Sequence, residues 1–333
     1  MDKRLKEYLK SGGSLGSLAD APKGRRASAP FPCDPAKVYA KQVDALALRL
    51  SRIGARDVVI GISGGLDSAL ALLVAVGAFK RLDMPASGIH AYTMPGFGTT
   101  SRTKSNAELL CEGLRVKVET IPIAKSVRQH LKDIGHDGKT ADVTYENAQA
   151  RMRTMILMDK ANMLGAIVLG TGDLSEIALG WCTYNGDHMS MFGVNSGVPK
   201  TVVRQVCEWW ARNVGRGKAS KALLDIVETP VSPELVKGQV TEDKLGPYEL
   251  HDFFIWNFCR NGLRRKELYD AAAKRYGGKY GLDLVGKTLD TFLWRIVSQA
   301  FKRNCAPDGI RVFSFDFSRD SWWIPSDMPA GWL

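Results

Sequence analysis

The residues with the clearest capacity for chemistry form one run, Gly61-Ile62-Ser63-Gly64-Gly65-Leu66-Asp67-Ser68, which follows the apolar stretch 58–60. Its three glycines allow a tight turn that brings backbone N–H groups close to phosphate oxygens, and its two serines add hydroxyl donors. The apolar stretch 69–79 predicts a buried helix, whose positive N-terminal end would hold the phosphates. Asp67 would repel polyphosphate unless a cation intervened, so a magnesium ligand is its natural role.

Spacing excludes two other phosphate-binding loops. The Walker pattern G-x-x-x-x-G-K-[ST] needs a lysine directly after its last glycine, and this run has none. The dinucleotide pattern G-x-G-x-x-G could begin at Gly170, but its sixth position is Ser175. A glycine-rich turn between a strand and a helix, without chemistry, is the simpler alternative. The run resembles instead the SGG-x-D-S loop of ATP pyrophosphatases, enzymes that split ATP between its α- and β-phosphates.

The elements that must position this loop follow from the pattern of apolar residues. We expect strands at 58–61, 88–94, 117–123 and 166–171, and helices at 35–53, 69–80, 103–114, 125–133 and 144–163. Strands that alternate with helices predict an α/β fold with a parallel sheet and helices on both faces. Because ligands collect at the carboxyl ends of such strands, the segments 61–68 and 170–176 are expected to share one site.

The chain outside these elements is expected to contain a loop, further helices and an N-terminal leader. Residues 181–200 are polar, aromatic and turn-rich, which predicts an active-site loop, and further helices are expected near 199–213, 219–227, 246–261 and 287–302. Residues 11–30 are rich in Gly, Ser, Ala and Pro. We therefore interpret residues 1–34 as a flexible basic leader and residues 35–333 as one catalytic domain with a helical C-terminal part.

Composition indicates a cytoplasmic enzyme. No apolar run approaches the roughly 20 residues that span a bilayer, and the N-terminus lacks the apolar core of a secretion signal. The six cysteines have no metal-like spacing. Of the net charge of +11, part comes from residues 1–30, which carry seven Lys or Arg against three acids. Because no basic stripe is interleaved with aromatic residues, we expect no nucleic-acid partner.

A second segment, Leu169-Gly-Thr-Gly-Asp-Leu-Ser-Glu-Ile-Ala-Leu-Gly-Trp-Cys-Thr-Tyr184, resembles the corresponding stretch of NAD synthetases, particularly the synthetase half of the glutamine-dependent branch. The same resemblance covers about residues 35–330. Its other motifs lie at 93–97, 145–149 with Arg151 and Arg153, 194–201, 245–252, 301–303 and 325–328. It implies the adenine nucleotide alpha hydrolase-like (PP-loop) fold.

The resemblance implies a reaction in two steps. The nicotinate carboxylate of deamido-NAD attacks the α-phosphate of ATP, giving an adenylate and pyrophosphate. Ammonia then displaces AMP and forms the nicotinamide of NAD. Both substrates are polyanions, so such a site needs Mg²⁺ and donors aimed at phosphate rather than an acid–base triad.

The resemblance also implies a role for each matching residue. The loop 61–68 and Thr171 would bind ATP, Asp67 and Glu176 would hold magnesium, and Lys200 would neutralise phosphate charge during transfer. Asp187 would position ammonia. The residues expected to bind deamido-NAD are Asn147, Glu176, Trp181, Cys182, Thr183, Tyr184 and Lys302.

Simpler structural roles stay open for several of these residues. Glu176 could be a solvated carboxylate in a first helical turn, where acids are favoured in any case. Lys200 could be a surface lysine that opens a helix. Trp181 and Tyr184 could belong to the core.

One departure from the resembled branch concerns the nitrogen source. That branch carries a glutaminase domain ahead of its synthetase half, whereas only about 35 residues precede the synthetase region here, too few to fold such a domain. We therefore expect use of free ammonia, or ammonia from a separate glutaminase. A homodimer is the expectation from the family.

Two other classes of function are weighed against this one. A different adenylating amidotransferase, or a tRNA-modifying enzyme, would share the first loop but not the segments 145–149 and 169–184. A nucleotide sensor without turnover would be expected to have lost Asp67, Glu176 or Lys200.

Overall fold

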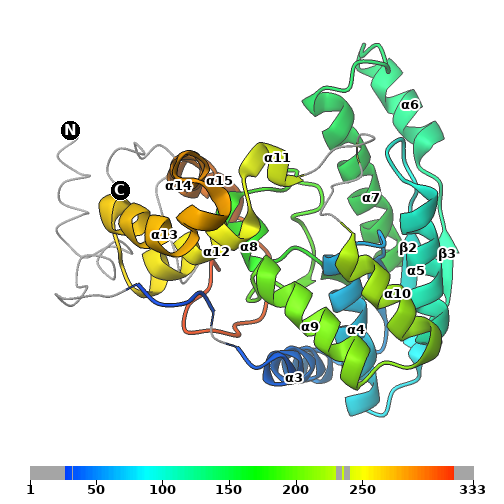
Figure 1. Cartoon of the computed structure of the whole chain (residues 1–333). Coiled ribbons are helices and arrows are strands. Elements are labelled where there is room, and N and C mark those ends of the chain that lie inside the picture. The colour runs from blue at the N-terminus through cyan, green and yellow to red at the C-terminus, as the bar shows by residue number, and fades with distance from the viewer. Residues whose placement is uncertain (1–26, 32, 230–234, 236–240, 319–333) are drawn as a thin grey trace, which may run out of the picture.

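The computed structural model describes residues 27–31, 33–229, 235 and 241–318. Most of the expected leader and the motif at 325–328 lie outside the described residues. A sheet-containing part and a helical part lie side by side, with α8 (Leu174–Leu179) between them (Figure 1). No helix in the described part of the chain is both long enough and apolar enough to cross a membrane.

Within the described residues, five strands form one parallel sheet in the order β3-β2-β1-β4-β5. Their bounds are β1 Val58–Gly61, β2 Ile89–Thr93, β3 Val118–Thr120, β4 Ile167–Gly170 and β5 Phe192–Gly193. The first four confirm the expected strands. The fifth lies inside the segment expected to be a loop, since two residues give no alternating pattern. β1 and β4 are neighbours, so their carboxyl ends meet at one edge.

Helices cover both faces of this sheet, as the sequence predicts. Side chains of β1 alternate: Val58 and Ile60 join the core beneath α3 (Pro35–Ile53) and α4 (Leu66–Arg81), whereas Val59 packs on the opposite side. On the first face also lie α5 (Ser101–Gly113), α9 (Lys200–Asn213) and α10 (Gly217–Glu228). The second face carries α6 (Ala124–Asp133) and α7 (Val143–Leu164).

The helical part contains elements that were only partly expected. It comprises α11 (Thr241–Leu245), α12 (Tyr248–Ile255) with a π-helical turn Trp256–Arg260, α13 (Arg265–Tyr280), α14 (Leu282–Ser298) and α15 (Ala300–Arg303). No helix was predicted at the position of α13. Its buried residues form a single narrow stripe (Leu268, Ala272 and Tyr276), which is too weak a signal for an amphipathic helix.

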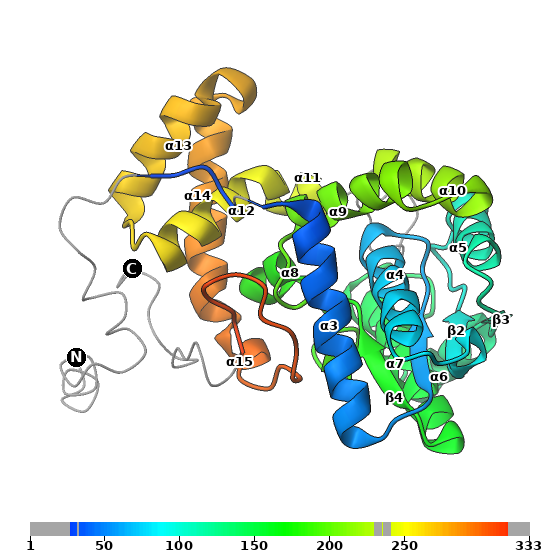
Figure 2. The same cartoon turned by 90° about the horizontal axis from the view of Figure 1, so that it is seen from below.

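The described end of the expected leader packs against the helical part. Ser28 N–H donates to Asn257 Oδ1 at 3.0 Å, and Trp256 Nε1 donates to Ser28 Oγ at 2.8 Å. Phe31 is 3% exposed and contacts the rings of Trp256, Phe313 and Phe315. The segment crosses the helical part before α3 begins (Figure 2).

Candidate active site

The loop after β1 turns at Gly64, whose φ of +89° lies in the left-handed region that favours glycine. The Ser68 hydroxyl accepts from Ser63 N–H at 3.2 Å and donates to the Gly65 carbonyl at 3.1 Å, which closes the loop. Helix α4 begins at Leu66 rather than at 69, because Gly65 has extended backbone angles and is the N-cap. The carboxylate of the motif therefore lies in the first helical turn, at the positive end of the helix.

Asn195 connects this loop to the end of β4. Its Nδ2 donates to the carbonyl of Asp67 at 2.8 Å and to the carbonyl of Thr171 at 3.0 Å. Gln42 of α3 donates to Asn195 Oδ1 at 3.0 Å, and both amide side chains are fully buried. The two strand ends expected to share a site are thus held together by a buried hydrogen-bond network.

Three carboxylates surround one ammonium group where α4, α8 and α9 begin. Lys200 Nζ lies 2.6 Å from Asp67 Oδ2, 2.9 Å from Asp173 Oδ2 and 2.9 Å from Glu176 Oε1. The side chain of Asp173 is fully buried and that of Lys200 is 4% exposed. With all groups ionised the cluster carries a net charge of −2, the charge that one divalent cation would neutralise.

The pKa values reflect this crowding. Burial raises the pKa of Glu176 to about 7, against the attraction of Lys200 and with added repulsion from Asp67. Burial likewise raises the pKa of Asp173 well above its ordinary value. For Lys200, burial lowers the pKa, but the carboxylates outweigh it and hold the ammonium charged. The single positive charge of Lys200 therefore does not balance the three carboxylates, and the cluster favours an additional proton or cation.

These residues fit a magnesium ion. One oxygen from each of Asp67, Asp173 and Glu176 lies within 4.8 Å of the others, and carboxylate oxygens are the ligands that Mg²⁺ prefers. Asp67 Oδ1 is buried and has no hydrogen-bond partner among the described residues. Asp173 is the less available ligand, because its other oxygen caps α8 by accepting from Glu176 N–H at 2.8 Å.

The surroundings of Lys200 differ from those expected for a lysine that neutralises phosphate charge. Its ammonium contacts carboxylates instead of facing open space, and Lys200 does not line the cavity described below. The ring of Tyr248 lies 5.3 Å from Nζ on the inner side. Lys200 is therefore a counter-ion of the cluster in this structure, and the simpler interpretation as a surface lysine is wrong.

The segment 181–184 is held in place by hydrogen bonds from two sides. Thr183 Oγ1 donates to Asn147 Oδ1 at 2.7 Å, and Thr183 N–H donates to Asp187 Oδ1 at 2.8 Å. Lys302 Nζ donates to the carbonyls of Gly180 and Cys182 at 2.8 and 2.7 Å. These expected dinucleotide contacts thus also shape the segment itself.

The two aromatic residues of this segment have different surroundings. Trp181 is half-buried, and the guanidinium of Arg295 lies 5.0 Å from its ring. Tyr184 is 43% exposed and stacks on His188 at 5.3 Å, with Phe301 also 5.3 Å away. Neither residue is a core residue, so both rings can face a ligand.

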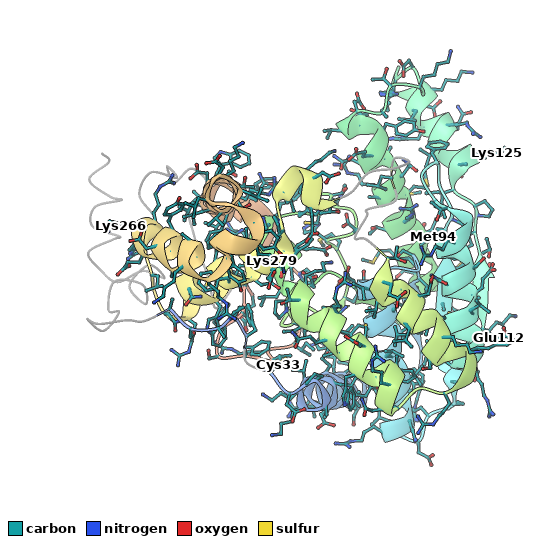
Figure 3. The ribbon with its side chains drawn as sticks, in the orientation of Figure 1. Cys33, Met94, Glu112, Lys125, Lys266 and Lys279 are labelled. Carbon is teal, nitrogen blue, oxygen red and sulfur yellow. The ribbon has the colours of Figure 1, made fainter. Side chains whose placement is uncertain are left out.

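One cavity of about 670 Å³ joins these features, a size that suits a small-molecule site. The expected site residues that line it are Gly61, Ile62, Ser63, Asp67, Ser68, Asn147, Thr171, Glu176, Trp181, Cys182, Thr183, Tyr184, Asp187 and Lys302. Gly64, Gly65, Leu66 and Lys200 are not among its lining residues. Met94, which also lines it, lies on the inner side of the sheet-containing part, whereas Glu112 lies at the outer edge (Figure 3).

Several residues of this site had no role in the sequence-based expectations. Asp173 precedes the expected Glu176 by three residues and could have been recognised as the N-cap of a helix. Asn195 lies in a segment, 194–201, that was matched only as a motif. Arg295 and Lys244 line the cavity from the helical part, and no local pattern distinguishes them from surface cations.

Comparisons with known proteins agree with this geometry. The family model described as NAD synthase matches residues 38–275. Glutamine-dependent NAD(+) synthetase of Mycobacterium leprae is 40% identical over 344 aligned positions, which cover 91% of this chain and 51% of that protein. The chain spans about half the length of the curated relatives that it matches.

Two solved structures are similar in fold. A glutamine-dependent NAD(+) synthetase from Cytophaga hutchinsonii has a TM-score of 0.73 and 16% identity, with 89% of this chain and 54% of that chain covered. An NH3-dependent NAD synthetase from Campylobacter jejuni has a TM-score of 0.55 and 21% identity, with 81% and 96% covered. The parallel sheet and its helices are thus those of the adenine nucleotide alpha hydrolase-like (PP-loop) fold.

Proposed function

This chain belongs to the NAD synthase family, and from that premise we propose that it converts deamido-NAD to NAD with ATP and ammonia. The observation that carries the proposal is the cluster of Asp67, Asp173, Glu176 and Lys200, which lies at the start of the phosphate-loop helix and beside the cavity lined by residues 181–184. A polyphosphate and an aromatic acid could meet there. The arrangement supplies charge and donors rather than a nucleophile.

In the proposed first step, an oxygen of the nicotinate carboxylate attacks the α-phosphorus of ATP, and the bond to the bridging oxygen of pyrophosphate breaks. The backbone N–H groups of the loop 62–65 and the first turn of α4 would receive the phosphates. The Ser63 and Ser68 hydroxyls lie 3.1 Å apart and line the cavity, so they can turn toward a phosphate oxygen. Thr171, at the adjacent strand end, would contact ATP from the other side.

We propose that Asp67 and Glu176 would hold magnesium at this point. When bound, that ion would neutralise phosphate charge and make the α-phosphorus a better electrophile. Lys200 would keep the Asp67 and Glu176 carboxylates ionised and oriented for this ion. Its role in this proposal is to hold the ligands rather than to touch ATP directly.

In the proposed second step, ammonia attacks the acyl carbon, AMP leaves with the bonding electrons, and a proton is released. Asp187 lines the cavity beside Thr183 and could position the ammonia or accept that proton. Asn147, Trp181 and Lys302 would hold the dinucleotide meanwhile. We propose ammonia as the reacting species whether it comes from solution or from glutamine hydrolysed at another site.

A location in the cytoplasm and a homodimer are further proposals that rest on the family resemblance. Light scattering on the purified chain tests the second. A mass of one chain at all concentrations would contradict it.

The deciding experiment measures NAD formation from deamido-NAD, ATP and magnesium, with ammonium in one reaction and glutamine in a parallel one. Product with ammonium supports the proposal, and product with glutamine alone would contradict ammonia from solution as the source. ATP binding without NAD or pyrophosphate release would favour a nucleotide sensor. When the site variant Asp67→Asn is run in the same assay, its matched control is Asp290→Asn, a change to an exposed carboxylate on α14.

A further inference from the structure

A second buried polar network lies directly behind the carboxylate cluster, and it centres on Asp252 of α12. This carboxylate is fully buried and does not line the cavity. Its Oδ2 accepts from Thr201 N–H at 2.9 Å and from Thr201 Oγ1 at 2.6 Å. Its Oδ1 accepts a short hydrogen bond from Ser175 Oγ. A buried carboxylate is costly unless it is hydrogen-bonded, and both oxygens of Asp252 accept hydrogen bonds, although burial still raises its pKa.

The partners of Asp252 are the neighbours of the site residues in the sequence. Ser175 directly precedes Glu176 in α8, and Thr201 directly follows Lys200 in α9. Ser175 Oγ also accepts from Lys200 N–H at 2.9 Å. One carboxylate therefore joins the first turns of the two helices that carry the opposite members of the Lys200–Glu176 ion pair.

The N-cap residue of helix α9 has no side chain that can cap the first turn, so the hydrogen bonds to Asp252 take the place of a cap. Its N-cap is Pro199, which makes no side-chain hydrogen bond to the first turn. Asp252 takes that role from another helix, and a carboxylate at a helix N-terminus also interacts favourably with the helix dipole. Tyr248, one turn earlier on α12, faces the same Lys200 with its ring. Its hydroxyl is buried without a hydrogen-bond partner in the described part of the chain.

We propose that Asp252 is a positioning residue for the reaction: it fixes the start of α9 against α8, so that the Lys200 ammonium stays on the Asp67, Asp173 and Glu176 carboxylates. Asp252 touches no substrate. The turnover assay that tests this proposal rests on the proposed function, whereas the contacts of Asp252 do not depend on it. It predicts that the helical part contributes to turnover, and not only to stability.

The test compares Asp252→Asn with Asp290→Asn, the same chemical change at an exposed ion pair of α14. In Asp252→Asn the negative charge is lost and an NH2 group replaces one oxygen: toward Thr201 it would face two donors, and toward Ser175 the hydroxyl would lose the acceptor for its proton. Displacement of reacting groups by about 1 Å can reduce the rate about 100-fold. We expect kcat per folded molecule to fall by about that factor. KM for deamido-NAD should stay within about twofold, because Asn147, Trp181 and Lys302 are held by other contacts.

A second pair keeps the test decisive if Asp252→Asn does not fold. Thr201→Val removes only the hydroxyl bond, and Thr201→Ser retains it. Thr201→Val should lose about tenfold in kcat, and Thr201→Ser should restore it. A lower melting temperature with unchanged kcat in both Asp252→Asn and Thr201→Val would overturn the proposal, because the network would then be structural only.

The same variants separate this inference from the proposed function. If the wild-type chain makes no NAD, the proposed function fails, and the inference is decided by calorimetric titration with ATP and magnesium. Weaker binding to Thr201→Val than to Thr201→Ser would support the positioning role. Equal dissociation constants would overturn it.

Discussion

Replacing Lys200 by Met removes the cation that lies among three carboxylates whose oxygens are within 4.8 Å of each other. Methionine has nearly the length of lysine, so the change removes charge more than volume. The carboxylates of Asp67, Asp173 and Glu176 would then repel one another in a largely buried space. The folded protein should lose stability, while the unfolded chain is hardly affected.

The size of the loss follows from the burial of the cluster. Lys200 is 4% exposed and Asp173 is fully buried, and breaking a buried ion pair costs about 3–5 kcal/mol. For a chain of this size, each kcal/mol lowers the melting temperature by about 2 °C, so we expect a decrease of about 6–10 °C. Protonation relieves part of the repulsion: the pKa of Glu176 is raised to about 7 even with Lys200 present, and removing Lys200 raises it further, so the loss should be smaller at about pH 6 than at about pH 8.

The assay is thermal unfolding of both proteins in EDTA and in excess magnesium. The variant site has one more uncompensated negative charge, so magnesium should bind it more tightly and raise its melting temperature more than that of the wild type. Lys266→Met, at a lysine of α13 that is 90% exposed, is the control and should change little. Equal melting temperatures of Lys200→Met and wild type in EDTA, at both pH values, would refute the electrostatic reasoning.

Three other outcomes are expected. Asp67→Asn should lower turnover by about 100-fold or more while the melting temperature stays near that of the wild type, because it removes a proposed metal ligand; near-normal activity would contradict that assignment. Glu176→Gln should be more stable than wild type in EDTA at about pH 8, by about 3 kcal/mol at most. The raised folded-state pKa of Glu176 stabilises the wild type fully below about pH 4.5, and this contribution is lost as the pH rises through about 7. The advantage of Glu176→Gln should therefore vanish toward about pH 5. An advantage that does not depend on pH would contradict the raised pKa of Glu176. Phe31→Ala should lower the free energy of unfolding by about 3–5 kcal/mol in urea denaturation, since Phe31 is 3% exposed; a loss below about 1 kcal/mol would show that its contacts with the helical part are weak.

The sequence predicted the sheet-containing part well because its signals are local. Short apolar runs separated by polar helical patterns indicate βα alternation without knowledge of any distant contact. The signal for the glycine-rich loop 61–68 was equally local. Only the start of α4 was placed three residues late, because an apolar Leu66 after glycines gives no sign of an N-cap.

The contacts inside the site could not be predicted in the same way. Lys200 and Glu176 were both expected near the phosphates, but their pairing depends on how α8 and α9 are oriented, and 23 residues separate the two in the chain. Asp252 is a stronger example, since its partners lie 77 and 51 positions away. The residues between 181 and 200 also give no local signal for β5. This two-residue strand is defined by its pairing with β4.

The hydrogen bonds from α15 to the segment after α8 have a consequence for how the molecule folds. Lys302 and Arg303 donate to the carbonyls of Gly180, Cys182 and Ala178, which lie more than 115 residues earlier in the chain. Contacts between positions so far apart form slowly, because closing so long a loop costs conformational entropy before the contacts can compensate it. During refolding from denaturant, helix content should therefore return before the wall of the cavity does. The nascent chain likewise cannot complete this cavity until α15 has been synthesised.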